Sequence, residues 1–149
     1  DARLFRMIKF RTMKVNHGGS TISVKGESRI TPLGAVMRKY KLDELPQLFN
    51  VFVGEMSLVG PRPEVRRYVD LYTQDQRQVL SIRPGITDYA SIAYSNENDL
   101  LAASSDPEKT YIEEIMPAKL ALNKKYMDEK DAFKDLSILF KTVSKIIRH

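Results

Sequence analysis

The residues of this chain best suited to chemistry are two adjacent carboxylates, Asp43 and Glu44, with arginines spaced around them. Arg38 precedes the pair by about one helical turn, and Arg62 and Arg83 each adjoin proline. Proline restricts the backbone on either side, so these two guanidinium groups are held on stiff corners. Guanidinium forks match phosphate oxygens, and Mg²⁺ prefers one or two carboxylates together with substrate phosphates. These are residue types that phosphoryl transfer uses: carboxylates such as Asp43 and Glu44 that can hold Mg²⁺, and arginines that can bind phosphate.

The carboxylate pair also has a simpler interpretation, in which Asp43 caps a helix and Glu44 is an acid of its first turn. Apolar residues follow at i, i+3, i+4 and i+7, and they predict one buried helical stripe: Leu45, Leu48, Phe49 and Phe52. Free backbone N–H groups and the helix dipole favour negative charge at such a start. Taken alone, the pair indicates a cap before it indicates an active site.

The elements around the pair can be predicted from periodicity. Residues 3–13 alternate apolar and basic side chains as a strand does, with Lys9 and Arg11 on one face. That face is either a solvated strand edge or the lining of a phosphate site. A turn at 15–19 and a strand at 20–24 complete a predicted hairpin.

The rest of the chain is predicted to be mostly helical. Helices are expected at 31–40, 63–72, 73–80, 106–117, 118–128 and 133–148, with strands at 57–59 and 88–94 and a polar substrate loop at 95–105. In the last helix an apolar stripe accompanies Lys134, Lys141, Lys145 and Arg148. This helix either packs on the core or lies in a membrane surface. The prediction is an α+β fold: a helix-rich single domain with a small β-hairpin or sheet and interfacial amphipathic helices.

Composition narrows the partners. The 149 residues suffice for one domain, and the absence of cysteine excludes disulfides and thiolate metal sites. A net charge of +5 suits nucleic acid, anionic lipid or phosphorylated substrates. The 24 Lys and Arg residues are spread along the chain without a nucleic-acid motif, so we expect no nucleic-acid partner. No apolar run approaches the roughly 20 residues that span a bilayer.

One long stretch carries a family resemblance. Residues 42–63 read L-D-E-L-P-Q-L-F-N-V-F-V-G-E-M-S-L-V-G-P-R-P. The string resembles the signature of the bacterial sugar transferases, the monotopic polyprenyl-phosphate phosphoglycosyl transferases. Other pieces agree in order: Lys9-Phe10-Arg11-Thr12-Met13, Arg29-Ile30-Thr31 and Arg83-Pro84-Gly85-Ile86-Thr87. The resemblance covers nearly the whole chain.

The resemblance implies a reaction and roles for the residues. The family transfers a phosphosugar from a UDP-sugar to polyprenyl phosphate, with UMP released and an aspartyl-phosphosugar intermediate formed. Asp43 is then the nucleophile, and Glu44 is a metal ligand or helps to activate the lipid phosphate. Phosphate binding falls to the basic residues of the matching motifs and their neighbours, which are Lys9, Arg11, Arg38, Arg62 and Arg83. The implied cofactor is Mg²⁺.

The resemblance also implies a setting. Family members carry an N-terminal re-entrant membrane helix before the first motif, so residues 1–149 are expected to be a catalytic domain without that helix, acting at the cytoplasmic face of the bacterial inner membrane. Oligomerisation is left open. Some members carry an acid where this chain has Asn123. If that acid supports the metal, this protein either manages without it or uses another group, such as Asp88. The competing classes are a nucleic-acid or phosphopeptide module and an inactive homologue that recruits partners.

Overall fold

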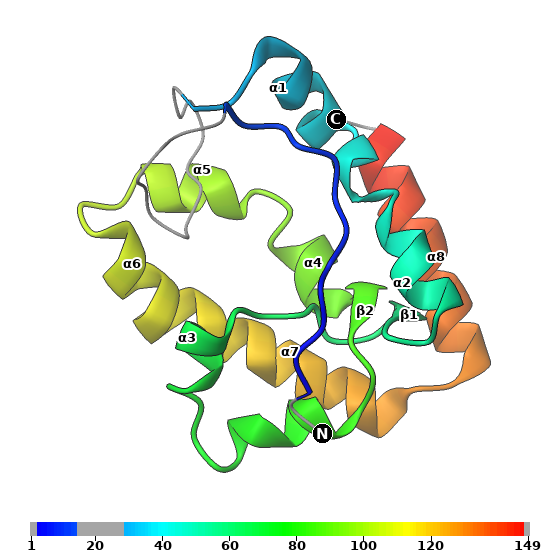
Figure 1. The fold of residues 1–149 in the computed structure, drawn as a ribbon. Helices are drawn as coiled ribbons and strands as arrows, with labels where there is room; N and C mark the ends of the chain where they lie inside the picture. The colour runs from blue at the N-terminus through cyan, green and yellow to red at the C-terminus, as the bar shows by residue number, and fades with distance from the viewer. Residues whose placement is uncertain (1–2, 15–28, 148–149) are drawn as a thin grey trace.

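The computed structural model describes residues 3–14 and 29–147, and helices dominate it (Figure 1). The elements in chain order are α1 (Pro32–Lys39), η1 (Leu42–Glu44), α2 (Gln47–Phe52), β1 (Ser57–Val59), α3 (Arg66–Val69), η2 (Gln76–Ser81), β2 (Gly85–Thr87), α4 (Tyr89–Ala93), α5 (Glu97–Ala102), α6 (Pro107–Thr110), the π-helical turn η3 (Tyr111–Ile115), α7 (Met116–Glu129) and α8 (Ala132–Ile147). The predicted helix-rich α+β class is confirmed.

The sheet is small and parallel. Strands β1 and β2 pair with Ser57 opposite Gly85 and Val59 opposite Thr87. The backbones meet so closely that a Cβ on Gly85 would lie 2.1 Å from the nitrogen of Gly60. Only glycine leaves room for this approach. Helices α4 and α8 both contact β2, and α8 also contacts β1, so the surrounding helices hold the two strands in place.

Two apolar clusters hold the helices together. The larger joins α3, η2, α5, η3 and α7 through Tyr68, Tyr72, Val79, Leu101, Tyr111, Ile115, Met116 and Leu120. The smaller joins the sheet to α7 and α8 through Val59, Tyr126 and Ile138. Because α7 contributes to both clusters, it is the element that ties the two halves of the core.

The stripe predicted to be buried on the helix after Asp43 is exposed, so that prediction is wrong. Leu45, Leu48, Phe49 and Phe52 are 52%, 50%, 58% and 87% exposed. The reason is that α2 buries its polar side chains instead: Gln47 and Asn50 are both 0% exposed. The outward face of α2 therefore presents apolar side chains to the surroundings.

Helices α1 and α8 also expose their apolar residues. In α1 these include Leu33 and Val36, and in α8 they are Phe133, Leu136, Phe140, Val143 and Ile147. We call this set, together with the four exposed residues at 45, 48, 49 and 52, the apolar surface. Of the α8 side chains only Ile138 is buried, so the core-packing interpretation accounts for one narrow side of α8. Within the described residues, no helix is long and apolar enough to cross a membrane.

Several element predictions need correction. Residues 3–12 form no strand, and the pairing seen there is one antiparallel bridge between Met13 and Ile30. The strand predicted at 88–94 is instead helix α4 (Tyr89–Ala93), which Asp88 caps by accepting from the Ser91 N–H. The predicted loop at 95–105 contains helix α5. The predicted turn at 15–19 and strand at 20–24 lie outside the described residues.

The remaining helices differ mainly in length. The helix predicted at 63–72 is reduced to α3, and the one at 73–80 is the 3₁₀ segment η2. The helices predicted on either side of Pro117 run on as α6, η3 and α7. Proline has no N–H group to donate to the carbonyl four residues earlier, and the wider π-helical turn before Pro117 accommodates the missing hydrogen bond. The helices predicted at 31–40 and 133–148 are confirmed as α1 and α8, the latter as far as Ile147.

Candidate active site

Asp43 lies in the turn η1, between α1 and α2, and its side chain caps no helix. Helix α2 begins only at Gln47, and no side chain caps its start. The turn is entered through Lys41, whose φ of 54° is unusual for a residue with a side chain. Asp43 is only 8% exposed, and its Oδ1 has no hydrogen-bond partner in the described structure. The cap interpretation is therefore wrong, and Asp43 keeps a buried oxygen free for another group.

Glu44 is held by two cations. Arg62 donates from Nη1 to Oε2 at 3.0 Å and from Nη2 to Oε1, and Lys9 Nζ lies 3.5 Å from Oε1. Burial alone raises the pKa of Glu44, but the charge and hydrogen bonds of Arg62, with Lys9 and Lys41, lower it to about 2. Glu44 is therefore a carboxylate over the whole physiological range.

Arg62 is fixed from its backbone as well as its side chain. Its N–H donates to Asp88 Oδ2 at 3.1 Å, and its Nη1 also donates to the carbonyl of Ile86 at 3.3 Å. Because β1 and β2 pair in parallel, the residues that follow the two strands lie next to each other. Arg62, after β1, therefore meets Asp88, after β2. Asp88 is 0% exposed and caps α4 with its other oxygen, so it holds Arg62 in position.

Lys9 belongs to the N-terminal segment, which lies along η1 and α2. The N–H of Phe10 donates to the Asp43 carbonyl at 3.0 Å, and the N–H of Ile8 donates to Asn50 Oδ1 at 3.0 Å. Burial and the positive charge of Arg62 lower the pKa of Lys9, against the raising effect of Glu44 and Asp43. A backbone contact with η1 and a side-chain contact with α2 thus bring Lys9 to the acidic pair.

The other predicted phosphate ligands are not gathered here. Arg11 and Arg83 are exposed, and neither lines the cavity described below. Arg38 donates from Nε to Thr12 Oγ1 at 2.8 Å, which fixes α1 against the N-terminal segment. The structure therefore brings together Lys9, Glu44 and Arg62 beside Asp43, and it leaves three of the predicted arginines outside that group.

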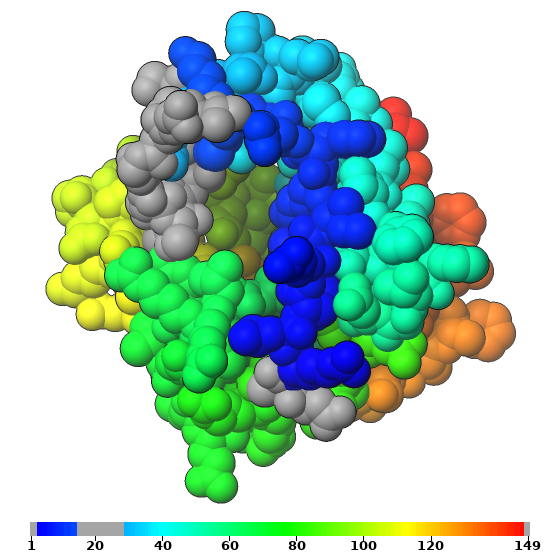
Figure 2. Space-filling view, viewed as in Figure 1, coloured from blue at the N-terminus to red at the C-terminus, as the bar shows by residue number. Residues whose placement is uncertain are grey.

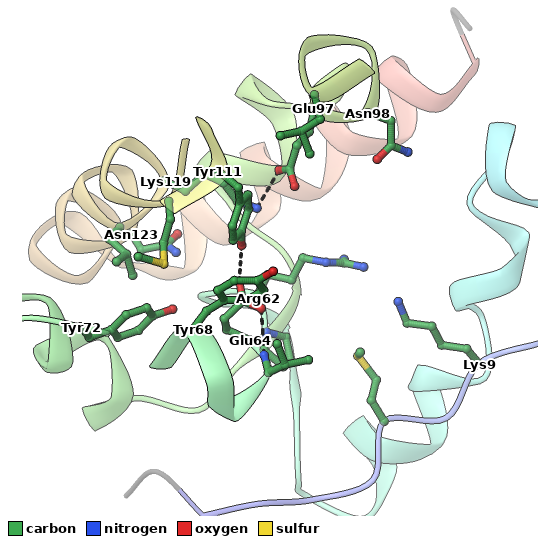
Figure 3. A pocket seen from close by; sticks show the side chains of 16 residues that line it. Lys9, Arg62, Glu64, Tyr68, Tyr72, Glu97, Asn98, Tyr111, Lys119 and Asn123 are labelled. Atoms are coloured by element: carbon green, nitrogen blue, oxygen red, sulfur yellow. Dashed lines mark hydrogen bonds and ion pairs between the residues drawn. The ribbon is translucent and has the colours of Figure 1, made fainter. Parts of the chain in front are cut away.

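A cavity of about 260 Å³ opens beside this group. Lys9 and Arg62 line one end, and α7 contributes a lining face of Met116, Lys119, Leu120 and Asn123. Figure 3 shows Asn123 and Tyr72 at the end away from Lys9. In the space-filling view a hollow lies on the same face, between the blue N-terminal segment and the green region of α3 (Figure 2).

Two polar pairs shape the cavity wall. Tyr111 donates its hydroxyl to Glu64 Oε2, and Lys119 Nζ lies 2.7 Å from Glu97 Oε2 (Figure 3). Burial first, and then the charge of Glu64, raises the pKa of the Tyr111 hydroxyl, so Tyr111 acts as a neutral donor. Sequence reasoning assigned none of these four residues to the site, because they come from four separate segments of the chain.

Two amides, those of Gln47 and Asn123, are also buried. Sequence reasoning missed Gln47 and noted Asn123 only as an amide where some family members carry an acid. Gln47 is 0% exposed, and both polar atoms of its amide lack partners in the described structure. Asn123 is 5% exposed, and its Oδ1 lacks a partner. A signal existed for Asn123, which follows Met116 and Leu120 at helical spacing on the side of α7 that is buried. None existed for Gln47, because the apolar periodicity assigns the opposite face of α2 to the inside.

The carboxylate oxygens of Asp43 and Glu44 meet part of what a magnesium ion requires. No cluster of three or more Asp, Glu or His side chains occurs within the described residues. Mg²⁺ does not need one, because it binds through one or two carboxylates plus substrate phosphates and water. The free Oδ1 of Asp43 is suited to this role. Both oxygens of Glu44 are already engaged by Arg62, so metal binding by Glu44 requires it to exchange that contact.

Comparison with known proteins places the chain in a family. The chain belongs to the bacterial sugar transferases, whose family pattern matches residues 1–149. It is 36% identical, over 97% of its length, to a UDP-N-acetylgalactosamine-undecaprenyl-phosphate N-acetylgalactosaminephosphotransferase of Aeromonas hydrophila, and it covers 32% of that protein. It is 38% identical to EpsL of Bacillus subtilis, named an uncharacterized sugar transferase, over 96% of the chain and 63% of the relative.

A third relative extends the comparison. The chain is 31% identical to an undecaprenyl-phosphate galactose phosphotransferase of Salmonella typhimurium, over 98% of the chain and 31% of that protein. The chain therefore spans about a third of two of these relatives and less than two thirds of the other.

Proposed function

We propose that this protein transfers a phosphosugar from a UDP-sugar to polyprenyl phosphate, with Asp43 as the nucleophile. The observation that carries the proposal is the buried, unpartnered Oδ1 of Asp43 next to the group formed by Lys9, Glu44 and Arg62. The family membership and the names of the relatives, which mention sugar nucleotides and undecaprenyl phosphate, support the same reaction.

The reaction is a pair of displacements at one phosphorus atom. In the first, an oxygen of Asp43 attacks the β-phosphorus, the bond from that phosphorus to the oxygen bridging the two phosphates breaks, and UMP leaves. In the second, an oxygen of polyprenyl phosphate attacks the same phosphorus. The bond to Asp43 then breaks, the carboxylate is restored, and the product is a polyprenyl-diphospho-sugar.

The basic side chains stabilise the negative charge that develops during this transfer. Phosphoryl transfer depends mainly on positioning and electrostatic stabilisation. Lys9 and Arg62 line the cavity beside the acidic pair, and Arg62 is held by Glu44, Asp88 and a backbone carbonyl, so it needs little reordering to bind a phosphate. Arg62 keeps its charge because burial, which lowers its pKa, is outweighed by Glu44, which raises it.

A divalent cation completes the proposed site. Asp43 and the donor's phosphates hold Mg²⁺, with Glu44 as a further ligand when it exchanges Arg62. When bound, the ion neutralises charge on the phosphates and on the departing UMP. Asp88, whose oxygens accept from Arg62 and Ser91, remains a positioning residue for Arg62.

The acceptor is a lipid, so the site needs to meet a membrane surface. We assign that contact to the apolar surface of α1, α2 and α8, helped by Lys134, Lys141 and Lys145 on α8. Exposed apolar residues in this number mark an interaction surface, and basic residues near them favour anionic headgroups. The protein then acts at the cytoplasmic face of the bacterial inner membrane, in the synthesis of surface polysaccharides.

The test is UMP release from a panel of UDP-sugars with polyprenyl phosphate in detergent. We expect release with at least one UDP-sugar and formation of a lipid-linked product. Asp43→Asn should abolish both, because an amide does not form the acyl phosphate. The matched control is Asp75→Asn, which alters an exposed carboxylate paired with Lys124 and should leave turnover unchanged. Turnover by Asp43→Asn, or none by the wild type with any donor, would contradict the proposal.

A further inference from the structure

Asn123 has the features of a ligand-binding residue. It lines the cavity, its side chain is 5% exposed, and its Oδ1 has no hydrogen-bond partner in the described structure. Burying a polar atom without a partner is costly. A side chain that carries this cost at a cavity wall is suited to a partner that arrives with a ligand.

The other buried asparagine shows that the fold can satisfy such a side chain. Asn50 is 0% exposed, and its amide donates to the Arg6 carbonyl at 2.9 Å and to Glu55 at 2.7 Å. Its Oδ1 accepts from the N–H of Ile8 at 3.0 Å. Asn50 therefore has a structural role that its bonds explain, whereas the described structure shows no such bond to Asn123 Oδ1.

The charges along the cavity divide it into two ends. Lys9 and Arg62 lie at one end, whereas Asn123 and Tyr72 lie at the other (Figure 3). The cation nearer Asn123 is Lys119, and it is already neutralised by Glu97 at 2.7 Å. Glu64 adds a further carboxylate to the wall. Among the described lining residues, the end at Asn123, which we call the inner end, thus offers hydrogen bonds without a spare positive charge.

The order of the proposed displacements indicates which part of the donor occupies the inner end. UMP leaves after the first displacement, while the sugar stays attached to Asp43 through its phosphate until the lipid arrives. The sugar is also bonded directly to the attacked phosphate, whereas the uracil is separated from it by the ribose and the second phosphate. If Lys9 and Arg62 hold the attacked phosphate, the sugar is the group that extends from it toward the inner end.

We infer that the inner end of the cavity selects a neutral sugar, and that Asn123 Oδ1 accepts a hydrogen bond from one of its hydroxyl or amide N–H groups. This inference rests on the proposed function and adds the substrate class to it. Sugars bearing a carboxylate are disfavoured, since their charge would face Glu64 and a lysine already paired with Glu97.

The first experiment compares Asn123→Leu with Asn50→Leu without ligand, by urea unfolding. Leucine is close to asparagine in size and removes the buried amide oxygen that has no partner at 123, so we expect no loss of stability there. At 50 it removes three satisfied bonds, so we expect a clear fall in the unfolding midpoint. Loss of stability in Asn123→Leu comparable to that in Asn50→Leu would show that Asn123 is structural, and would overturn the inference.

The second experiment measures binding by calorimetry of UDP, UDP-galactose, UDP-N-acetylgalactosamine and UDP-glucuronate. We expect the wild type to bind a neutral UDP-sugar more tightly than UDP or UDP-glucuronate. Asn123→Leu should weaken that UDP-sugar by about tenfold or more while UDP stays within about twofold. Asn123→Asp, which keeps the acceptor oxygen, should retain more of the affinity than Asn123→Leu.

The outcomes separate this inference from the proposed function. Equal weakening of UDP and the UDP-sugar in Asn123→Leu would place the nucleotide at the inner end, and no weakening of either would leave Asn123 without a role in binding. UDP-glucuronate binding as tightly as the neutral donors would equally overturn the selection of a neutral sugar. Failure of the wild type to bind every one of these ligands would instead contradict the proposed function itself.

Discussion

Replacing Glu44 by glutamine tests the electrostatics of the site in a way that needs no substrate. The side chains of Glu44 and Arg62 are only 12% and 27% exposed, so loss of the carboxylate leaves a largely buried guanidinium without its partner. Lowering the pKa of Glu44 from 4.5 to about 2 corresponds to about 3 kcal/mol of stability, at 1.36 kcal/mol for each pKa unit. We therefore expect Glu44→Gln to be less stable than the wild type at pH 7 by about that amount.

The pH dependence gives the sign of the same effect. A carboxylate whose pKa is lower in the folded protein contributes its full stability above the unfolded value of about 4.5, and loses it as pH falls toward about 2. The difference between wild type and Glu44→Gln should therefore be largest near neutral pH and shrink on acidification below about pH 5.

The assay is urea unfolding followed by circular dichroism at a series of pH values from 7 to 3. The control is Glu108→Gln, because the pair of Arg67 with Glu108 is 60% and 39% exposed and should be worth less than about 1 kcal/mol. A difference for Glu44→Gln no larger than that of the control, or one that does not change with pH, would refute the reasoning.

Three further predictions concern activity and the membrane. Chelation should abolish UMP release, and Mg²⁺ but not Ca²⁺ should restore it, since the larger and looser shell of Ca²⁺ suits in-line transfer less well; full activity in excess chelator would exclude the metal. Arg62→Lys should lose most of its turnover, because a point charge does not reproduce the two-pronged contact with Glu44. Arg83→Lys is the control, since Arg83 is exposed and lies outside the cavity, and its turnover should be close to that of the wild type. Equal losses in the two variants would show that the cavity is not the reaction site. The protein should bind anionic vesicles more weakly as salt is raised, since each basic residue near the membrane surface contributes about 1 kcal/mol of binding energy that salt screens. Phe140→Asp should weaken vesicle binding further, because Phe140 is exposed on α8. Vesicle binding that does not change with lipid charge, salt or this substitution would show that α8 has another use.

The sequence predicted the existence of most helices but not what they bury. Periodicity identified α1 and α8 with bounds close to the observed ones, because Thr31 with Pro32 and a long amphipathic pattern are strong local signals. Periodicity does not say whether an apolar stripe faces a core or an external surface. The stripe containing Leu48 and Phe49 was consequently assigned to the interior, although it is exposed.

The candidate site was predictable as far as its residue types. Asp43 and Glu44 stand out because they adjoin each other, and Arg62 stands out because prolines flank it. The contact between Glu44 and Arg62 depends on the pairing of β1 with β2 and on the hold of Asp88, which are long-range features without a sequence motif. The same limit explains why Arg83 appeared equivalent to Arg62, although only Arg62 lines the cavity.

The residues of the cavity wall could not be predicted from the sequence for a related reason. Glu64 and Tyr111 are far apart in the chain and meet because α3 and the helical run from α6 to α7 share one core. In the sequence, Asn123 stands out only as an amide where some family members carry an acid. The lack of a partner for its Oδ1 becomes visible only once the packing of α7 is known.

The central claim is that Asp43 carries the phosphosugar between the two displacements. The direct measurement is mass spectrometry of the protein quenched after incubation with a UDP-sugar and Mg²⁺ but without polyprenyl phosphate. We predict an added mass equal to one phosphosugar, located on Asp43 after proteolysis, lost on addition of polyprenyl phosphate and missing from Asp43→Asn. A protein that releases UMP in the full reaction yet never carries that mass, or carries it equally in Asp43→Asn, would contradict the claim.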